Sequence, residues 1–266
     1  METPDTLKIL TYNVNGIRSA MNKGLVDWLR AVDADFICFQ EIKANPEQFD
    51  VGLFEALGYH CHWYPAQKKG YSGTALLSKR KPEAVSFGCG HPLFDAEGRV
   101  LRADFGTFSI MSTYFPSGSS GDVRQDVKMQ FLDFFSGYMR ELQPQIAPVF
   151  ICGDINICHR PIDIHDPVGN KKSSGFLPEE RAWMDVFLEK DYVDSFRLFN
   201  QEPHQYTWWS MRANARANNK GWRIDYIFAN EKLKSALKKA VILPEARHSD
   251  HCPMLLHFEA PKQIDR

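Results

Sequence analysis

The sequence predicts an α/β fold, because short apolar segments typical of strands alternate with helical patterns nearly from one end of the chain to the other. Several of the strand segments are apolar at consecutive positions, which is typical of strands buried on both faces. Mixed sheets packed face to face would bury strands in this way. The sequence contains no internal repeat, low-complexity tract or linker, so a single domain over residues 1–266 is the simplest arrangement.

The first half of the chain is expected to contribute four strands and a helix. Residues 7–12 and 36–39 are short apolar runs that predict strands, and residues 25–31 between them have helical spacing. Residues 72–78 and 107–115 are rich in β-branched and aromatic side chains, which favours strands.

The second half continues the same alternation. Residues 124–142 are predicted to form a helix, because their apolar side chains recur at helical spacing. Residues 148–152 predict a buried strand that ends abruptly. Residues 178–189 open with a proline and two glutamates, which is typical of a helix N-terminus. Residues 222–229 and 254–258 complete the set as strands.

The composition is that of a globular protein. Hydrophobic residues make up 44% and charged residues 24% of the chain, which excludes disordered, collagen-like and coiled-coil proteins. No segment approaches the roughly 20 apolar residues needed to cross a bilayer, and the acidic, polar start of the chain does not resemble a secretory signal. The six cysteines form no Cys-x-x-Cys pair, which argues against zinc-ribbon and thioredoxin-like proteins. We therefore expect a cytoplasmic protein with reduced thiols and no membrane partner.

The charge balance gives little global indication of a nucleic-acid partner. Lys and Arg number 32 against 33 Asp and Glu, a net charge of −1, so the basic excess of many nucleic-acid-binding proteins is missing. Residues 212–223 differ, because they carry positive side chains and no negative one. On charge alone, a solvated surface is the simpler interpretation of this segment. Its positive residues are Arg212, Arg216, Lys220 and Arg223.

Five of the apolar strand segments lead to, or carry, a carboxylate, amide or imidazole. Loops at strand ends are where a rigid α/β scaffold commonly displays its reactive groups. The polar residues are Asn13 and Asn15 after the first strand, Gln40 and Glu41 after the second, Asp154 and Asn156 after residues 148–152, Asp225 within residues 222–229, and His248, Asp250 and His251 before the last strand.

Each of these residues also has an ordinary structural explanation. Asn13 and Asn15 suit a turn, Asp154 could cap a helix, and a single glutamate after a strand usually lies at the surface. Asp225 differs, because a carboxylate inside an apolar strand needs a partner. His251 is a candidate for that partner.

Together, the residue types fit metal-assisted phosphodiester hydrolysis. Glu41 and Asp250, helped by one of the asparagines after the first strand, offer hard oxygen ligands suited to Mg²⁺ or Mn²⁺. Asp154 could position or activate a water, and Asn156 could donate to a phosphoryl oxygen. An Asp–His pair could hold an imidazole charged beside a phosphate. The sequence has no Gly-x-Ser-x-Gly elbow, Walker A loop or Gly-x-Gly-x-x-Gly turn, which argues against serine-nucleophile and nucleotide-binding enzymes.

Several short motifs occur in a characteristic order. They are Asn13-Val14-Asn15-Gly16-Ile17-Arg18, Gln40-Glu41-Ile42-Lys43, Tyr71-Ser72-Gly73, Gly153-Asp154-Ile155-Asn156, Gly169-Asn170-Lys171-Lys172 followed by Ser174-Gly175-Phe176, Pro178-Glu179-Glu180-Arg181, Tyr206-Thr207-Trp208-Trp209, Gly221-Trp222-Arg223-Ile224-Asp225-Tyr226 and Ser249-Asp250-His251. In this order they resemble the exonuclease III-type apurinic/apyrimidinic (AP) endonucleases, over about residues 7–258. The wider superfamily also includes deoxyribonuclease I-like nucleases, inositol-phosphate 5-phosphatases and neutral sphingomyelinases.

The resemblance implies a four-layer α/β sandwich, in which two mixed sheets pack together and helices cover the outer faces. It also implies Mg²⁺-dependent cleavage of double-stranded DNA 5′ to an abasic site, leaving a 3′-hydroxyl, as part of base-excision repair. A 3′-phosphodiesterase activity and some 3′→5′ exonuclease activity would accompany it. A compact, monomeric enzyme of the bacterial type, without a regulatory N-terminal extension, is the expectation.

The resemblance further implies roles near the scissile phosphate. Glu41 would be the principal metal ligand, with Asp250 and Asn13 nearby, and Asp154 would position or deprotonate the attacking water. Tyr114 matches a tyrosine that approaches the phosphate, although by its position alone it would be a half-buried aromatic residue at a strand end. The other residues implied at the phosphate are Asn156 and His251, and Asp225 would orient His251. Possible further metal ligands are Asp154, Asn156 and His251.

A second group is implied to contact DNA. Trp208, Trp222 and Ile224 match positions that line a pocket for the flipped abasic sugar, from which a bulky base would be excluded; ordinary core packing is the alternative. Arg212 and Arg216 lie in a segment that mixes aromatic and cationic side chains, as expected where a bent duplex is gripped. The remaining residues implied to contact the substrate are Asn15, Lys43, Tyr71 and Asn170, of which Lys43 and Asn170 would otherwise be surface and loop residues.

Four residues depart from the family pattern and bear on the balance of activities. Asn15 stands where some members have aspartate, which leaves one negative charge fewer near the metal. Arg212 replaces an apolar residue that some relatives insert into the duplex. Ser117 and Ser173 stand where relatives have asparagine.

Two other functions remain as alternatives. A less specific nuclease or another phosphoesterase of the same superfamily would share the acidic residues and the histidine. A DNA-binding module without activity would have lost them, whereas all of them are present in this sequence.

Overall fold

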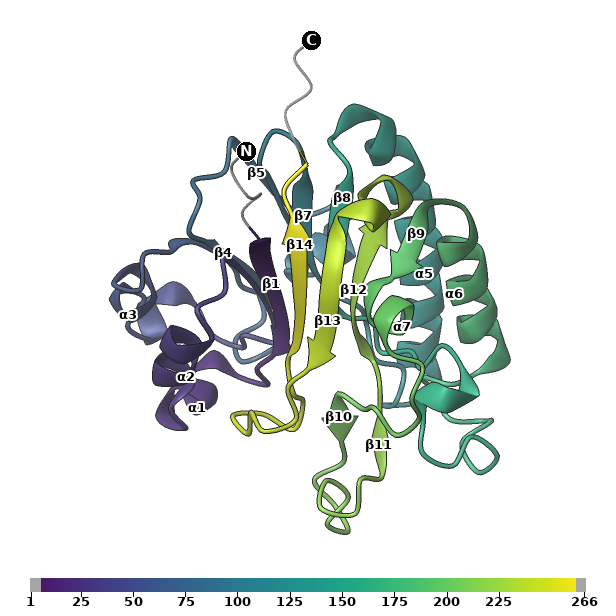
Figure 1. Ribbon diagram of the computed structural model, residues 1–266. Helices are drawn as coiled ribbons and strands as arrows, with labels where there is room; N and C mark the ends of the chain where they lie inside the picture. The colour runs from purple at the N-terminus through teal and green to yellow at the C-terminus, as the bar shows by residue number, and fades with distance from the viewer. Residues whose placement is uncertain (1–5, 262–266) are drawn as a thin grey trace.

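The computed structural model describes residues 6–261, and two six-stranded β-sheets form its centre (Figure 1). Both sheets are mixed, because β1–β2 and β7–β8 are parallel pairs and the other pairs are antiparallel. In spatial order, the first sheet contains β13 (Leu237–Ile242), β14 (Met254–Glu259), β1 (Thr6–Asn13), β2 (Phe36–Gln40), β4 (Thr74–Ser78) and β3 (His60–Tyr64). The second contains β5 (Ala84–Phe87), β6 (Val100–Asp104), β7 (Ser109–Tyr114), β8 (Val149–Asp154), β12 (Asp225–Asn230) and β9 (Tyr192–Asp194).

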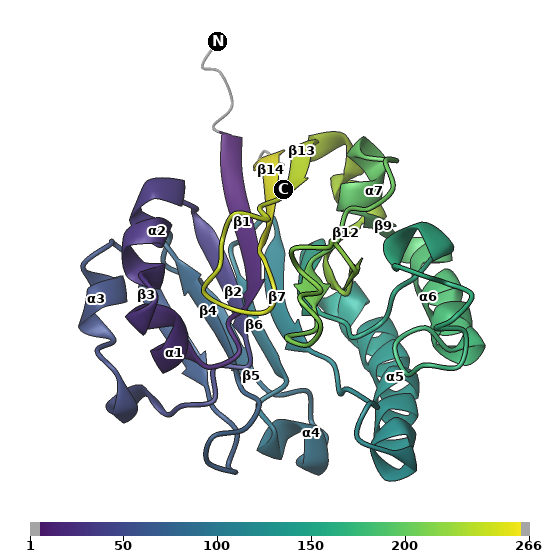
Figure 2. The same cartoon turned by 90° about the horizontal axis from the view of Figure 1, so that it is seen from below.

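Helices cover the outer faces of the two sheets, so the molecule has four layers (Figures 1 and 2). The four-layer α/β sandwich expected from the sequence is therefore confirmed. On the side of the first sheet lie α1 (Ile17–Asn22), α2 (Leu25–Val32) and α3 (Gly52–Glu55); on the side of the second lie α5 (Asp122–Leu142) and α6 (Pro178–Asp191). The shorter helices are α4 (Pro92–Ala96) and α7 (Ser195–Phe199), and a two-stranded hairpin is formed by β10 (Trp208–Trp209) and β11 (Gly221–Trp222).

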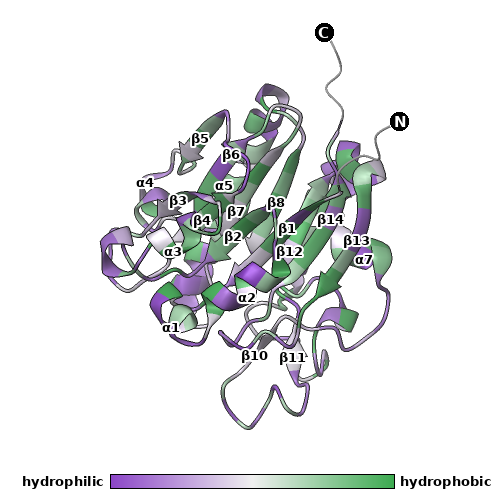
Figure 3. Cartoon of the chain, turned by 60° about the vertical axis from the view of Figure 1, so that its left-hand side comes forward, coloured by the Kyte–Doolittle hydropathy of each residue, from purple (hydrophilic) through white to green (hydrophobic). Residues whose placement is uncertain are grey.

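Three apolar clusters hold these layers together. One lies between the sheets and includes Phe36, Phe108 and Phe258. The second lies between the first sheet and its helices, and the third between the second sheet and α5 and α6. Because the central strands bury both faces, they carry apolar residues at consecutive positions, and Figure 3 shows them mostly green for this reason.

The two central parallel pairs place four strand ends at one edge of the sandwich. β1 and β2 pair through Asn13 and Gln40, and β7 and β8 pair through Tyr114 and Asp154. β12 runs the opposite way and begins at this edge, where Asp225 is opposite Asp154. Polar side chains that are far apart in the sequence therefore meet here.

All the strands and helices expected from the sequence are present, with two differences at this edge. β8 continues to Asp154 instead of ending at residue 152, because Asp154 is paired on both sides. The strand expected over residues 222–229 is split into β11 and β12. At the break, the backbone N–H groups of Ile224 and Asp225 both donate to Thr207 Oγ1 at 3.1 Å instead of to a neighbouring strand.

Several short elements were not expected from the sequence. β3 and β5 are edge strands with half-buried or exposed residues, so they lack the apolar runs that reveal central strands. Cys38 and Cys152 are buried free thiols between the sheets, as expected. Within residues 6–261, no helix is long and apolar enough to cross a membrane.

Candidate active site

A cavity of about 330 Å³ opens at the edge where β1, β2, β7 and β8 end. It contains most of the residues expected at the scissile phosphate and two of the tryptophans expected in the sugar pocket. Its lining residues are Glu41, Tyr114, Ser117, Ser119, Asp154, Asn156, Ser174, Trp208, Trp222, Ile224, Asp250 and His251.

Asn13 joins the two halves of the site. Its amide nitrogen donates to Glu41 Oε1 at 3.1 Å and to Asp154 Oδ2 at 2.9 Å, and the side chain is fully buried. Its Oδ1 accepts the backbone N–H of Asn15 at 3.0 Å. The turn expected from the two asparagines is therefore present, and the same asparagine also links the carboxylates of the two sheets.

Glu41 is held ionised by its neighbours. Lys43 Nζ lies 2.7 Å from Oε2, and the Tyr114 hydroxyl donates to Oε1 at 2.5 Å. Burial alone would raise the pKa of Glu41, but the charge of Lys43 and these hydrogen bonds outweigh burial and lower it. Burial and the charge of Glu41 raise the pKa of Tyr114, so the phenol stays protonated as the donor.

Asp225 and His251 form the pair expected from the sequence. His251 Nδ1 lies 2.9 Å from Asp225 Oδ2, and its Nε2 is directed toward Asp154, 3.9 Å from Oδ2. Burial lowers the pKa of His251, but Asp225 and Asp154 outweigh burial and raise it to about 10, so the imidazole is charged at neutral pH. Burial and the charge of Asp225 raise the pKa of Asp154.

Asn156 follows β8 in the left-handed conformation, with a φ of 56°. Its backbone N–H donates to Asp154 Oδ1 at 2.9 Å, so Asp154 closes a turn instead of capping a helix. Its amide nitrogen donates one hydrogen to the carbonyl of Phe115 at 3.0 Å. The amide has a second N–H, which leaves a donor for a ligand in the cavity.

Asp250 lies at the other side of the cavity. Asn15 Nδ2 donates to its Oδ1 at 2.9 Å, and Trp208 Nε1 donates to its Oδ2 at 3.0 Å. Burial acts to raise the pKa of Asp250, but His251 and these two donors outweigh burial and lower it. Asn15 also accepts from Lys43 Nζ at 2.5 Å, so it connects Asp250 to the environment of Glu41.

This donor set fits a divalent cation. Asp154, Asp225 and His251 offer ligand atoms within 4.8 Å of one another, and Asp225 Oδ1 is buried without a hydrogen-bond partner among the described residues. In that cluster His251 is charged, and a protonated imidazole has no lone pair to offer an ion. The oxygens of Glu41, Asp154 and Asp250 line the cavity without this conflict, and carboxylate oxygens are the ligands that hard cations such as Mg²⁺ and Mn²⁺ prefer.

Two indole rings line the cavity as well, and that of Trp208 donates to Asp250. Trp208 and Trp222 pair across the β10–β11 hairpin, with ring centroids 5.9 Å apart and planes at 87°. Ile224 is buried beside them in a small apolar cluster with Phe176. By contrast, Trp209 is a core residue, with 4% of its surface exposed.

Three residues expected to contact DNA have their polar groups engaged outside the cavity. The Tyr71 hydroxyl accepts from Arg99 and Arg124 and donates to Glu97. The Asn170 amide donates to two carbonyls of its own loop, those of residues 165 and 166. Arg216 donates to the carbonyls of residues 244, 246 and 249 and stacks over Trp209, so it braces the loop that carries Asp250.

The positive segment at residues 212–223 is not one solvated surface. Arg212 and Lys220 are exposed, as expected of a solvated surface. Arg223 is fully buried, so this interpretation is wrong for that residue. Its side chain turns inward because Asp163 and Asp194 accept from it at 2.8 and 2.6 Å.

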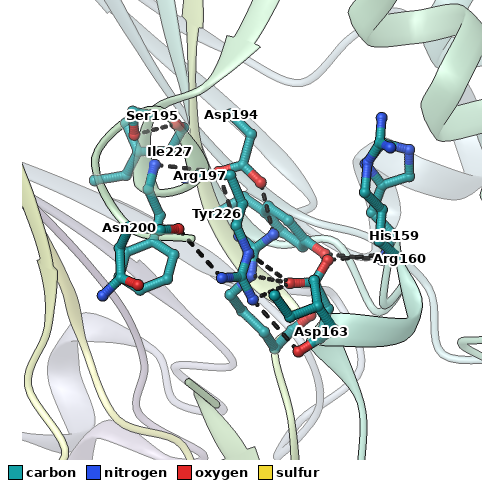
Figure 4. Close-up of polar contacts among 12 residues, drawn as sticks. His159, Arg160, Asp163, Asp194, Ser195, Arg197, Asn200, Tyr226 and Ile227 are labelled. Atoms are coloured by element: carbon teal, nitrogen blue, oxygen red, sulfur yellow. Dashed lines mark hydrogen bonds and ion pairs between the residues drawn. The ribbon is translucent and has the colours of Figure 1, made fainter. Parts of the chain in front are cut away.

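A larger groove of about 690 Å³ lies next to these ion pairs and does not contain the candidate site. Figure 4 shows that Asp163 and Asp194 are engaged by arginines, including Arg197, which lies 2.7 Å from Asp163. The buried charges in this groove are paired with one another, and none of the residues expected at the phosphate or the sugar lines it. The smaller cavity is therefore the candidate active site.

Sequence reasoning missed two parts of the site. Ser119 lines the cavity but carries no pattern that would have singled it out, whereas Ser174, also in the lining, belongs to the Ser174-Gly175-Phe176 motif. Glu180, in a motif noted above, and Lys128 form a buried ion pair behind the cavity. Glutamate and lysine are usually exposed on helices, so only the resemblance of the Glu180 motif offered a signal.

The chain is similar over most of its length to known nucleases. Residues 10–251 match the Endonuclease/Exonuclease/phosphatase family. The chain is 41% identical over 252 residues to an exodeoxyribonuclease of Bacillus subtilis, covering 94% of this chain and 98% of the relative. It is 38% identical over 253 residues to the DNA repair nuclease APEX1 of Danio rerio, covering 94% and 81%. The solved structure of an AP endonuclease from Archaeoglobus fulgidus superimposes with a TM-score of 0.86 at 31% identity, covering 95% of this chain and 99% of that one.

These matches confirm the resemblance to the exonuclease III-type AP endonucleases that the motifs indicated. The family match includes every residue that lines the cavity, from Glu41 to His251. The chain belongs to the endonuclease/exonuclease/phosphatase family.

Proposed function

We propose that the chain is a Mg²⁺-dependent AP endonuclease of DNA base-excision repair. It hydrolyses the phosphodiester 5′ to an abasic site and leaves a 3′-hydroxyl, with 3′-phosphodiesterase and some 3′→5′ exonuclease activity. The observation that supports this function best is one small cavity lined by carboxylates, His251, Asn156 and two indoles. The names of the relatives, exodeoxyribonuclease, DNA repair nuclease and AP endonuclease, support the same activity. The chain acts as a single catalytic domain, as a monomer in the cytoplasm.

Asp154 is the group that positions the attacking water and accepts its proton. It lies at the floor of the cavity between Asn13 and Asn156, whose N–H groups fix its two oxygens. A pKa raised by burial and by Asp225 makes this carboxylate a stronger base than an exposed aspartate.

His251 and Asn156 stabilise the charge that develops on the phosphate. Asp225 accepts from His251 Nδ1, which fixes the ring and leaves Nε2 for the substrate. The charged imidazolium then faces the anionic phosphate in a buried site, where such an interaction is stronger than in water. The free N–H of the Asn156 amide donates to a phosphoryl oxygen.

Glu41 is the principal residue that would hold the metal, with Asp250 and Asn13, and with Asp154 and Asn156 within the same set. His251 lies beside this set, but as a charged imidazolium it offers no lone pair to a metal ion. Bound Mg²⁺, or Mn²⁺ in its place, would neutralise charge on the phosphate and on the leaving oxygen. Tyr114 and Lys43 keep Glu41 ionised and oriented for this role.

Trp208, Trp222 and Ile224 enclose the flipped abasic sugar, and their apolar faces exclude a nucleotide that carries a base. Extruding a nucleotide from the duplex costs least free energy where no base stacks or pairs. The shape of the pocket and the cost of extrusion therefore both favour cleavage at an abasic site. The remaining substrate contacts are of two kinds. Direct contacts come from Arg212, Asn15 and Lys43. Indirect contacts come from the loops that Tyr71, Asn170 and Arg216 hold in place.

Two labelled duplexes test this function, one with a single tetrahydrofuran abasic analogue and one intact. We expect one nick on the 5′ side of the analogue with Mg²⁺, none with EDTA, and no cleavage of the intact duplex. Equal degradation of both duplexes would instead indicate a less specific nuclease. Absence of cleavage, with a retained gel shift, would indicate a DNA-binding protein without activity.

Asn15→Asp is expected to lower the Mg²⁺ concentration for half-maximal cleavage by about tenfold, the equivalent of about 1.4 kcal/mol. The substitution places a second carboxylate beside Asp250 and removes a hydrogen-bond donor to Asp250. The negative charge near the cation is then greater, so the cation binds more tightly. The measurement is a Mg²⁺ titration of single-turnover cleavage. Asn22→Asp, an exposed position at the end of α1, is the matched control. Superimposable curves for Asn15→Asp and the unmodified protein would contradict the prediction.

A further inference from the structure

A fully buried ion pair lies behind the candidate active site and does not line the cavity. Lys128 of α5 and Glu180 of α6 have side-chain exposures of 0% each, and Lys128 Nζ lies 2.6 Å from Glu180 Oε1. Removing two charges from water costs free energy that their attraction often fails to recover, so such a pair is weak evidence of a purely stabilising role. Its remaining hydrogen bonds indicate what it holds.

Lys128 holds the backbone of Asn156. Its ammonium donates to the Asn156 carbonyl at 2.8 Å, in addition to Glu180. Asn156 has a φ of 56°, a conformation that asparagine tolerates but that costs free energy unless the surroundings impose it. The ammonium is therefore one of the groups that fix the peptide from which the Asn156 amide projects into the cavity.

Glu180 holds the neighbouring loop. Its Oε2 accepts the backbone N–H groups of Gly175 at 2.7 Å and Leu177 at 3.0 Å, and its Oε1 accepts from Gln125 at 3.0 Å. The residue before Gly175, Ser174, lines the cavity. Oε2 therefore holds the loop that follows Ser174, while Oε1 holds Lys128 and Gln125.

The loop and the Asn156 segment fit closely against the indole wall. A Cβ added to Gly175 would lie 2.9 Å from the Trp222 ring and 3.1 Å from the Asn156 carbonyl oxygen, the acceptor of Lys128. Gly175 also accepts the backbone N–H of Cys158 at 2.7 Å. A shift of either segment therefore moves the other, and with it the distance between the Asn156 amide and the sugar pocket.

We propose that the Lys128–Glu180 pair is a positioning element of the active site, which sets the Asn156 amide and the Ser174 wall relative to the scissile phosphate. The proposal rests on the proposed function, because it assigns the pair an effect on that reaction. The pair acts through Asn156 and touches neither the phosphate nor the water.

Lys128→Met tests the proposal, because it keeps the length of the side chain and removes the charge and the donor. We expect kcat for cleavage of the abasic duplex to fall by about 10- to 100-fold, since small displacements of a positioned group cost rates of this order. KM should change less than about threefold, because the residues that enclose the DNA are not altered. Arg140→Met, at an exposed position in the last turn of the same helix, is the matched control and should leave both constants unchanged.

A double-mutant cycle distinguishes positioning from general loosening of the structure. Asn156→Ala should itself lower kcat by about 10²- to 10³-fold, as expected for loss of one donor to developing charge. In that background, Lys128→Met should have almost no further effect, because the group that it positions is gone. Equal factors in both backgrounds, or an effect on KM alone, would overturn the proposal.

Two further results keep the outcome interpretable. If Lys128→Met does not fold, Glu180→Gln replaces it in the cycle, because glutamine retains an acceptor for the loop and removes only the charge. If Asn156→Ala cleaves at the rate of the unmodified protein, the proposed function of the site is wrong. If Asn156→Ala is impaired and Lys128→Met lowers kcat by the same factor with and without it, only the role of the ion pair is overturned.

Discussion

Asp154→Asn is expected to cleave an abasic duplex about 10³- to 10⁴-fold more slowly than the unmodified protein in single-turnover experiments with Mg²⁺. The substitution retains the shape of the side chain and removes the only carboxylate that lies between Asn13, Asn156 and His251 in the described structure. The amide cannot accept the proton of the attacking water, so the loss should appear in kcat and persist at saturating metal.

The same variant should remain folded. Because burial and Asp225 raise the pKa of Asp154, its ionised form is costly in the folded protein, and a neutral amide removes this cost. Removing this cost should offset the loss of one of the hydrogen bonds that Asp154 accepts from Asn13 and Asn156. We therefore expect an unfolding free energy within about 1 kcal/mol of that of the unmodified protein. Asp126→Asn, exposed on α5, is the control for activity and stability. Cleavage by Asp154→Asn at a near-normal rate would remove this residue from the reaction.

The candidate site was largely predictable because its residues obey a simple rule of α/β proteins. Polar side chains at the carboxyl ends of neighbouring buried strands must meet, and the positions of Asn13, Glu41 and Asp154 could be read from the apolar runs before them. The pairing of Asp225 with His251 followed from the cost of burying a carboxylate without a partner. In both cases, the local sequence pattern and the packing of the strands predict the same positions for these side chains.

The charges that act from behind the cavity could not be predicted in this way. Lys128 lies in a helix where a lysine is expected at the surface, and its partner is 52 positions away on another helix. Arg223 belongs to a run of positive residues whose charge predicted a solvated surface, yet the side chain is buried against Asp163 and Asp194. A charge becomes buried only when a distant segment supplies its counter-charge, and neither helical periodicity nor local composition carries that information.

Asp163→Asn is expected to lower the free energy of unfolding at pH 7 by about 3 kcal/mol, measured by urea denaturation. Asp163 is fully buried and accepts from both Arg197 and Arg223, so the substitution removes the charge that two buried guanidinium groups share. Asp27→Asn is the matched control. Asp27 pairs with Arg30 at the exposed surface, so its loss should change stability by less than about 0.5 kcal/mol.

The pH dependence of this difference identifies its electrostatic origin. Burial acts to raise the pKa of Asp163, but Arg223 and Arg197 outweigh burial and lower it to about 2. A carboxyl with a depressed folded pKa contributes its full stability above the pKa of the unfolded chain, near 4, and loses it as the pH falls toward 2. The difference between the two proteins should therefore be constant from pH 7 to 5 and shrink below pH 4. A difference that stays constant down to pH 3 would mean that Asp163 acts through packing. Because the Asp163 carbonyl accepts the backbone N–H of Arg223, between the cavity residues Trp222 and Ile224, the same loss of charge should also loosen the indole wall of the site.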